Sequence, residues 1–319
     1  MNTINEYGVK DRFTAEAARY PQWTLARVIA QHKGRYTLAT EQGECPAEVS
    51  GKFRYQAATP SQYPVVGDYV MVTQPAHGGQ AIIHQVLTRA STFQRTAVGV
   101  MGQSQIVAVN IDIAFLCMSL NHNFNLSRLE RYLAIAWDSG ATPVILLTKS
   151  DLCEDLEEKI RAVEGVAALT DVVVTSALDE EACSKVLDYV KPGVTASFLG
   201  SSGVGKSTLI NRLMGEAVMA TSEVGRLDKG RHTTTGREML VLPNGGVVID
   251  TPGMREIGVE SVDLSKAFAD IEELEATCKF SDCTHKKEPG CAVQQALADG
   301  RIDQRRLDSY FKLKREAKY

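Results

Sequence analysis

Residues 199–208 read LGSSGVGKST, which matches the phosphate-binding pattern G-x-x-x-x-G-K-[ST] in full. An apolar run, TASFLG, precedes the pattern and a helix-forming segment, KSTLINRLMG, follows it, which is the context that the pattern requires. The glycines let backbone amides turn inward onto phosphate oxygens, and the positive end of the helix dipole adds to the attraction. The stretch predicts an α/β nucleotide-binding domain; the alternative is a glycine-rich turn that binds nothing.

Two side chains of this loop have specific expected roles. Lys206 is expected to reach the β- and γ-phosphates, and the Ser207 hydroxyl is expected to bind Mg²⁺. The predicted nucleotide contacts in the loop are Gly200, Ser201, Ser202, Gly203, Val204, Gly205, Lys206, Ser207 and Thr208.

A strand that ends in Asp-Thr-Pro-Gly, VVIDTPG at 247–253, follows the loop. It resembles the GTPase segment whose Asp holds Mg²⁺ through water and whose Gly senses the γ-phosphate. Asp250 and Gly253 are therefore expected to take these roles.

The first switch of a GTPase lies between these two motifs, which places it at RHTTT, residues 231–235. A threonine hydroxyl there would complete the Mg²⁺ shell. Thr234 is the predicted ligand, with Thr235 and Thr233 as alternatives.

The segment LLTKSD (146–151) predicts the identity of the base. In it an apolar run ends in the tetrapeptide TKSD, which resembles the guanine-reading tetrapeptide of GTPases. The carboxylate of Asp151 can accept hydrogen bonds from the N1–H and N2–H₂ groups of guanine, and a purine without these donors would leave it unpaired. TSA (175–177) ends the next predicted strand and resembles the loop whose backbone amide contacts guanine O6. The predicted base contacts are Thr148, Lys149, Asp151, Ser176 and Ala177.

The order of these segments is unusual, because the base-reading tetrapeptide precedes the phosphate loop. Each loop needs only its neighbours in space, so a chain whose original termini are joined and which is reopened elsewhere keeps the sheet and the site. The order therefore predicts a circularly permuted GTPase domain.

Apolar runs outside the motifs indicate the rest of the architecture. Short alternations broken by Gly between residues 23 and 94 predict four or five strands of a small barrel or sandwich, with a hairpin at Gly78-Gly79. Continuous runs at 109–120 and 142–148 predict buried strands of a parallel sheet, with a helix from Leu126 to Trp137 between them. Residues 237–250 predict a hairpin.

The segment CKFSDCTHKKEPGC contains three thiols and one imidazole at Cys278, Cys283, His285 and Cys291. This ligand set suits tetrahedral Zn²⁺ with no open position, which predicts a structural site. The following tail interleaves Arg305, Arg306, Lys312, Lys314 and Arg315 with Tyr310 and Phe311. The tail can contact RNA or can be a helix whose aromatic stripe packs on the zinc module.

Bulk properties limit the location and the partners. The chain has 319 residues, with neither a run long enough to span a bilayer nor the basic start and apolar core of a signal peptide, so a cytoplasmic protein without membrane contacts is expected. The net charge is −4, but residues 1–100 carry +3 and 301–319 carry +4, so a polyanionic partner would meet the two ends.

In combination, the barrel-like start, the permuted order, GRHTTT, DTPG and the Cys/His cluster resemble the RsgA (YjeQ) family from about residue 22 onward. The family consists of bacterial GTPases that act in late maturation of the small ribosomal subunit. The resemblance implies an α/β fold in which a circularly permuted P-loop GTPase domain is flanked by an N-terminal OB-fold β-barrel and a C-terminal zinc-binding helical domain. The predicted divisions are a flexible leader (1–21), the OB-fold (22–96), the GTPase domain (97–260) and the zinc domain (261–319).

The resemblance implies a GTP hydrolase that binds the small ribosomal subunit and its rRNA, acts as a monomer, and requires Mg²⁺ with GTP and one structural Zn²⁺. Position 254 is Met where many GTPases place the glutamine that orients water, so intrinsic hydrolysis should be slow. His232 matches the family's GxHTT pattern and is the candidate to hold the water, or it packs or contacts the partner. A metal-delivery GTPase and a GTP-dependent RNA-binding switch are the alternative functions.

Overall fold

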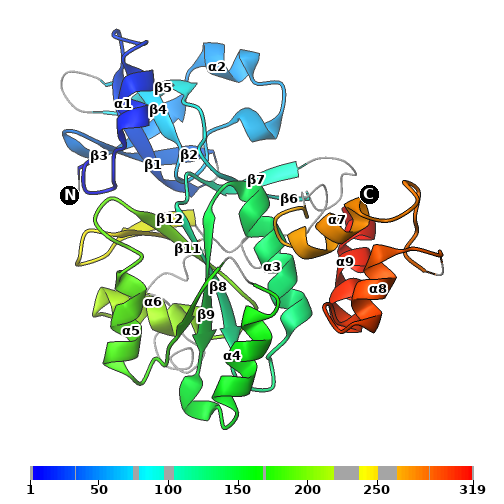
Figure 1. The fold of residues 1–319 in the computed structure, drawn as a ribbon. Coiled ribbons are helices and arrows are strands. Elements are labelled where there is room, and N and C mark those ends of the chain that lie inside the picture. Colours follow the sequence, from blue (N-terminus) through cyan, green and yellow to red (C-terminus); the bar gives the residue numbers. More distant parts are fainter. Residues whose placement is uncertain are drawn as a thin grey trace.

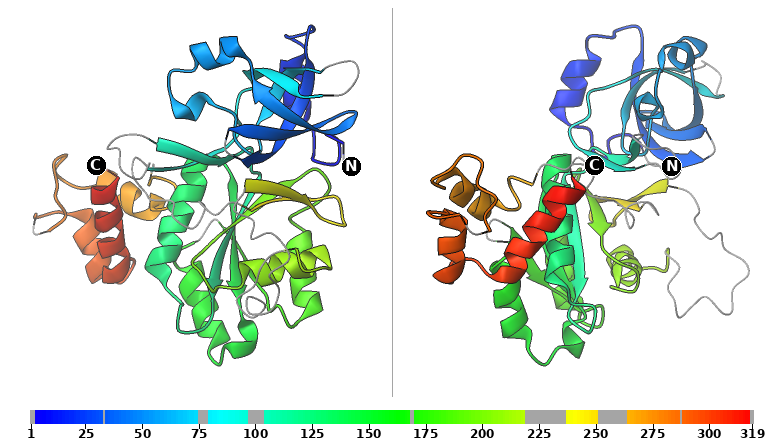
Figure 2. Two further views of the ribbon diagram at one scale, coloured as in Figure 1. Left: turned by 180° about the vertical axis from the view of Figure 1, so that it is seen from behind. Right: turned by 90° about the vertical axis from the view of Figure 1, so that its right-hand side faces the viewer.

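The computed structural model describes residues 3–32, 34–74, 79–96, 104–167, 170–218, 237–250, 264–286 and 288–317. Three parts follow one another along the chain: a β-barrel, an α/β domain and a group of C-terminal helices (Figure 1). The views in Figure 2 show the barrel over one end of the α/β domain and the C-terminal helices beside helix α3 (Leu126–Ser139).

Five strands form the barrel, as the alternating pattern predicts. They are β1 (Thr24–His32), β2 (Arg35–Thr40), β3 (Gly43–Val49), β4 (Tyr69–Thr73) and β5 (Ala81–Val86). Their order is β1-β2-β3-β5-β4, and β4 pairs back onto β1, which closes the sheet. Helix α2 (Gly51–Gln56) and the 3₁₀ turn η1 (Pro60–Gln62) lie between β3 and β4, and β3 runs parallel to β5. This closed five-stranded arrangement is OB-like.

The expected flexible leader over residues 1–21 is wrong from residue 3 onward. Helix α1 (Asp11–Ala17) lies there, and Phe13 stacks on Tyr69 of the barrel with ring centroids 3.9 Å apart. The fully buried Arg27 side chain donates hydrogen bonds to the Tyr7 carbonyl and to Thr195 Oγ1 (2.9 Å). The segment is mostly polar, so its few anchoring side chains are not evident from its composition. Arg27, which binds the Tyr7 carbonyl, is itself held by Thr195, 168 residues further along the chain.

The α/β domain contains six strands in the order β10-β9-β8-β11-β13-β12. The strands are β8 (Ile113–Ser119), β9 (Thr142–Thr148), β10 (Asp171–Val174), β11 (Thr195–Leu199), β12 (Arg237–Val241) and β13 (Val247–Asp250). The first five in the order are parallel, and β12 is antiparallel to β13, so both the predicted parallel sheet and the predicted hairpin are confirmed.

Helices cover both faces of this sheet. Buried side chains of α3 and α4 (Leu156–Glu164) pack on one face, and those of α5 (Glu180–Leu187) and α6 (Lys206–Met214) pack on the other. Burial on both faces explains why the strands are continuous apolar runs. At the edge of the sheet, β12 pairs with β1, so the sheet continues into the barrel.

The buried strand expected over 109–120 is confirmed only from Ile113 to Ser119, as β8, because the chain turns a corner at the start of the apolar run. Strand β7 (Ser104–Val109) ends there and pairs with β6 (Thr92–Thr96), and β8 begins only at Ile113. Asn110 forms the corner with φ 55°, and its amide accepts from the Ala90 N–H (2.7 Å) and donates to the Gly67 carbonyl (3.0 Å). Both sides of the corner are apolar, so periodicity does not reveal it.

The C-terminal part consists of α7 (Ala269–Ala276), α8 (Ala292–Ala298) and α9 (Gln304–Glu316). Of the two interpretations of the basic tail, the structure supports packing: Tyr310 is fully buried, and Phe311 lies 6.2 Å from His285 between ring centroids. No helix in the described part of the chain is both long enough and apolar enough to cross a bilayer.

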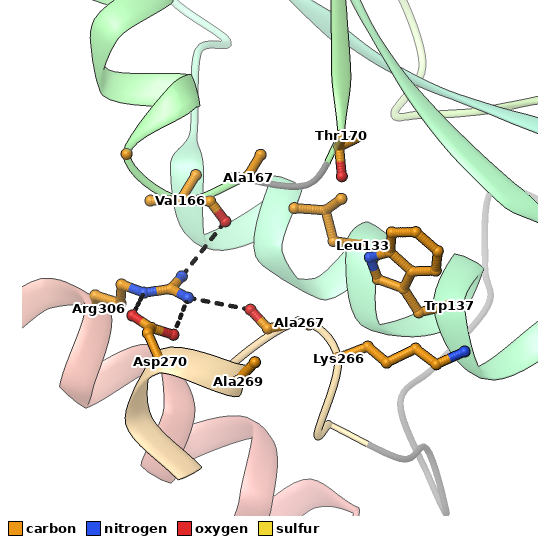
Figure 3. Close-up of a pocket in the computed structure, with 11 residues that line it drawn as sticks. Leu133, Trp137, Val166, Ala167, Thr170, Lys266, Ala267, Ala269, Asp270 and Arg306 are labelled. Carbon is orange, nitrogen blue, oxygen red and sulfur yellow. Dashed lines mark hydrogen bonds and ion pairs between the residues drawn. The ribbon is translucent and has the colours of Figure 1, made fainter. Parts of the chain in front are cut away.

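Arg306 of α9 joins the C-terminal helices to the α/β domain. Its guanidinium donates to Asp270 of α7 (2.6 Å) and to the fully buried Glu130 of α3 (3.1 Å). It also donates to the Ala267 carbonyl at 3.1 Å, as Figure 3 shows from the side of the adjoining pocket. A cation held in this way is not available for RNA phosphates.

We predict that Arg306→Ala lowers the free energy of unfolding by about 3–5 kcal/mol, because Glu130 is left as a buried, less compensated charge. Urea unfolding monitored by tryptophan fluorescence measures the effect, and Lys312→Ala is the control, since Lys312 is an exposed cation on the same helix. A loss below about 1 kcal/mol in Arg306→Ala would contradict the role of this ion pair.

Candidate functional site

The sheet topology brings the predicted nucleotide motifs to one edge. Because β9, β10, β11 and β13 are parallel members of one sheet, their carboxyl ends lie at the same side. The tetrapeptide from Thr148 follows β9, the Thr175–Ala177 segment follows β10, and the phosphate loop follows β11. Asp250 ends β13, whose residue Ile249 is in register with Ser197 of β11. Ligands of open α/β sheets bind at this edge.

The phosphate loop connects β11 to α6 and depends on its glycines. Gly200, Gly203 and Gly205 have φ values of 154°, 77° and 102°. A Cβ atom at Gly200 would lie 2.7 Å from the Cys117 carbonyl oxygen, so a side chain does not fit there. At Gly203 and Gly205 space is free, and the positive φ is the constraint.

Lys206 begins α6 and is 7% exposed. Its Nζ donates hydrogen bonds to the carbonyls of Gly200 (2.6 Å) and Ser201 (2.8 Å), so the loop curls around the ammonium. Burial raises the pKa of the neighbouring Cys117 thiol to about 12, although Lys206 acts in the opposite direction. The thiol therefore stays protonated and does not neutralise the lysine.

A direct hydrogen bond joins the base-reading segment to the phosphate loop. Thr148 is 5% exposed, and its Oγ1 donates to the Val204 carbonyl at 2.6 Å. The two residues are 56 positions apart and in the order expected of a permuted domain. This bond gives Thr148 a role that the sequence does not reveal: it braces two loops against each other.

The remaining predicted base contacts lie beside this brace. Lys149 has a left-handed backbone (φ 60°, ψ 41°), which is uncommon for a residue with a side chain and is typical of functional turns. Asp151 is exposed, and one of its carboxylate oxygens accepts a hydrogen bond from the Ser176 hydroxyl. Ser176 is therefore placed to orient the carboxylate, and Ala177 beside it is half-buried.

The predicted Mg²⁺ shell is only partly within the described chain. Ser207 is half-buried in the first turn of α6, and Asp250 ends β13. The other predictions at this side of the site lie outside the described residues: His232, Thr233, Thr234, Thr235 and Gly253, together with Met254.

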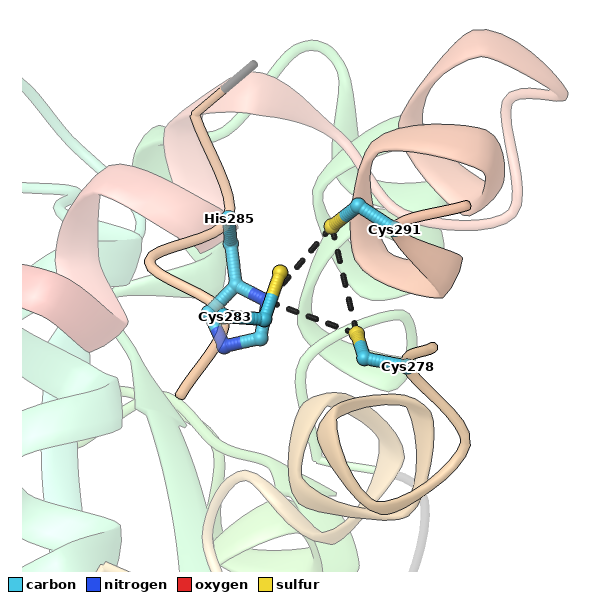
Figure 4. Close-up of side chains that lie close together, drawn as sticks. All are labelled: Cys278, Cys283, His285 and Cys291. Atoms are coloured by element: carbon cyan, nitrogen blue, oxygen red, sulfur yellow. Dashed lines mark hydrogen bonds between the residues drawn. The ribbon is translucent and has the colours of Figure 1, made fainter. Parts of the chain in front are cut away.

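The four predicted metal ligands come together in the C-terminal part (Figure 4). Their ligand atoms all lie within 4.8 Å of one another. Cys278 Sγ and Cys291 Sγ are 3.9 Å apart, and each is 3.5 Å from His285 Nδ1. A tetrahedral Zn²⁺ with Zn–S of about 2.3 Å and Zn–N of about 2.0 Å requires edges of roughly 3.8 and 3.5 Å. The side chains therefore fit a tetrahedral metal ion, and Nδ1 is the imidazole nitrogen that faces it.

Glu275 supports this cluster from behind. Its Oε1 lies 3.0 Å from His285 Nε2, the nitrogen that points away from the thiols. The same carboxylate accepts from Tyr310 Oη (2.9 Å) and Lys314 Nζ (2.8 Å) of α9. A carboxylate on the outer nitrogen fixes the tautomer and orientation of a metal-binding histidine. Nothing in the Cys/His spacing points to Glu275.

We predict that Glu275→Gln weakens metal binding by about 10–100-fold, because the histidine loses the charged partner that orients it. Competition with a chromophoric chelator, with Zn²⁺ as the probe, measures the affinity. Glu273→Gln is the matched control, since Glu273 is exposed on the same helix. Equal affinities of the two variants would show that Glu275 has no such role.

The comparisons with known proteins agree with this geometry. A model of the RsgA GTPase family matches residues 86–260. The chain is 48% identical over 320 residues to "Small ribosomal subunit biogenesis GTPase RsgA 2" of Lactiplantibacillus plantarum, which covers 99% of this chain and 90% of the relative.

Two solved structures are similar over nearly the whole chain. YjeQ from Thermotoga maritima has a TM-score of 0.69 and 27% identity, covering 92% of this chain and 98% of that one. YloQ, described as a circularly permuted GTPase, has a TM-score of 0.64 and 27% identity, with 93% and 95% covered. The permuted order of the motifs in this chain agrees with the description of YloQ, and the chain belongs to the RsgA GTPase family.

Proposed function

We propose that the chain hydrolyses GTP to GDP and phosphate at the edge of the parallel sheet, in the service of small ribosomal subunit biogenesis. The observation that carries the proposal is the hydrogen bond from Thr148 to the Val204 carbonyl, because it holds the base-reading segment against the phosphate loop. One nucleotide can then contact both segments at once, as the family membership requires.

Guanine selection depends on Asp151 and its surroundings. Since Ser176 donates to one carboxylate oxygen, Asp151 is oriented before a base arrives, and its acceptors face the N1–H and N2–H₂ groups of guanine. Adenine lacks this pair of donors. Lys149, held in its left-handed turn, lies along the base, and Ala177 contributes its backbone amide to O6.

We predict that Asp151→Asn lowers the affinity for GTP by about 10–100-fold, the equivalent of losing a charge-assisted hydrogen-bond pair. It should raise the affinity for xanthosine triphosphate, whose C2 carbonyl accepts from the new amide. Titration with fluorescent GTP and xanthosine triphosphate tests both effects, with Glu154→Gln, an exposed acid three residues on, as the control. An unchanged preference between the two nucleotides would remove Asp151 from the base site.

Phosphate binding is assigned to the loop from Gly200 to Thr208. Lys206 neutralises charge on the β- and γ-phosphates, and Mg²⁺, when bound, supplies further stabilisation of the charge that develops in phosphoryl transfer. Ser207, Asp250 and Thr234 would hold the ion, and Gly253 would contact the γ-phosphate. His232 would hold the attacking water in place of the glutamine that Met254 replaces.

The metal in the C-terminal cluster is assigned as one structural Zn²⁺. The three thiols and one imidazole fill a tetrahedral shell, so the site leaves no open position for chemistry. Glu275 and α9 enclose the histidine, which disfavours the alternative of a metal-delivery GTPase. Rapid exchange of the bound metal with free Zn²⁺ would favour that alternative.

We assign the small ribosomal subunit and its rRNA as the partner, because the relative's name refers to small ribosomal subunit biogenesis. The OB-like barrel is a fold that binds nucleic acid, and α2 presents the exposed cations Lys52 and Arg54. On α9, Lys312 and Arg315 are exposed, whereas Arg306 is buried in ion pairs. A monomer acting in the cytoplasm fits this role.

We predict that purified small subunits raise the rate of GTP turnover well above the intrinsic rate, and that this stimulation weakens as salt increases. Phosphate release measured with and without subunits checks the result, with large subunits as the control. Turnover that small subunits leave unchanged would instead favour a GTP-dependent RNA-binding switch.

In the same assay, His232→Ala should lose the stimulated rate, because the attacking water would lose the side chain that holds it. Full stimulation in this variant would remove the catalytic role of His232.

A further inference from the structure

The first turn of α3 brings a cation to the phosphate loop. Arg128 Nη1 lies 3.4 Å from Ser201 Oγ, and this is the hydrogen bond that the structure gives to its guanidinium. Among the described residues, no carboxylate forms an ion pair with Arg128. The side chain is half-buried, so its charge is not simply dispersed into solvent.

The helix itself gives no reason for a cation at this position. Asn125 caps α3 by accepting from the Arg128 N–H at 2.9 Å, so Arg128 lies at the positive end of the helix dipole. Cations are disfavoured there by some tenths of a kcal/mol. The contact with the phosphate loop therefore explains the residue better than helix stability does.

The two ends of the phosphate loop can be distinguished by their neighbours. Val204 lies at the base end, because its carbonyl accepts from Thr148. Ser201 lies at the other end, because its carbonyl is 2.8 Å from Lys206 Nζ, the group that reaches the β- and γ-phosphates in this motif. Arg128 contacts the side chain of Ser201, so its guanidinium binds the loop residue whose carbonyl accepts from the phosphate-binding Lys206.

The surroundings restrict where Arg128 can go. Together with Ser201 and Val204 it lines a cavity of about 10 Å³, which is room for roughly one water molecule. Two residues further along α3, the buried Glu130 accepts from Arg305 and Arg306 of α9 at 3.1 Å each, and Arg131 pairs with Glu316 at 2.9 Å. Helix α3, which carries Arg128, is therefore bound to α9 within three residues of the contact that Arg128 makes with the phosphate loop.

We propose that Arg128 is a positioning residue for GTP hydrolysis, which holds the γ-phosphate end of the phosphate loop through Ser201 and adds positive charge there. The inference rests on the proposed GTPase function and adds a residue that the phosphate-loop and switch motifs do not contain. A fixed cation at this place stabilises the negative charge that develops on the transferred phosphoryl group. It is of particular value in a chain that has Met254 instead of a water-orienting glutamine.

The test compares Arg128→Ala and Arg128→Lys with the wild-type chain in GTP turnover and in binding of GDP and of a non-hydrolysable GTP analogue. For Arg128→Ala we expect kcat to fall by about 10–100-fold, as for other small losses of positioning, with GDP affinity within about twofold of wild type. Lysine should restore part of kcat, since it keeps the charge but not the fork of donors. Arg161→Met, which alters an exposed cation of α4 that pairs only with the exposed Glu157 among the described residues, should keep the wild-type basal rate.

A double-mutant cycle with Ser201→Ala separates this role from general structure. If Arg128 acts through Ser201, the double variant should lose less than the product of the two single losses in kcat. Strictly multiplicative losses, an unchanged kcat in Arg128→Ala, or an equal loss of GDP affinity and kcat would each overturn the proposal. A wild-type chain that hydrolyses no GTP, even with small subunits, would instead overturn the function on which it rests.

Discussion

The candidate nucleotide site depends on a contact between two segments that lie far apart in the sequence. The Thr148 hydroxyl donates to the Val204 carbonyl at 2.6 Å, and both atoms lie at the carboxyl edge of a parallel sheet. Parallel pairing brings the loops to the same edge, but it does not set the spacing between them. The buried hydrogen bond sets that spacing, because leaving either group unpaired away from water would cost about 1–3 kcal/mol.

Much of the fold could be predicted from local features of the sequence. The phosphate loop is recognisable because glycines at fixed spacing are required by backbone angles, and the buried strands because both of their faces are apolar. The corner at Asn110 and the anchoring of residues 3–17 could not be predicted. In both cases the decisive partners, Gly67 for Asn110 and Thr195 for Arg27, are distant in sequence and are contacted through single polar atoms.

The candidate site shows the same division. Residue types with intrinsic chemistry, such as three cysteines and a histidine or Gly-Lys-Ser after a strand, indicate their own role. Glu275 and Arg128 are ordinary polar residues that only their three-dimensional neighbours distinguish. Thr148 and Ser176 belong to predicted motifs, but their hydrogen bonds to Val204 and Asp151 emerge only from the structure. A sequence motif therefore predicts the residues that would touch the ligand, whereas the residues that position them emerge from the fold.

Helix α3 contacts both the phosphate loop and the C-terminal helices. Within four residues it contacts the phosphate loop through Arg128, and the C-terminal helix α9 through Glu130 and Arg131. Helix α9 in turn holds Glu275 and, through it, the histidine of the metal cluster. The links from α3 to α9 are ion pairs of 2.9 and 3.1 Å, of which the pair of Glu130 with Arg306 is buried, whereas the hydrogen bond from Arg128 to Ser201 is longer, at 3.4 Å. A displacement of the C-terminal helices would thus reach the phosphate loop through these contacts of α3.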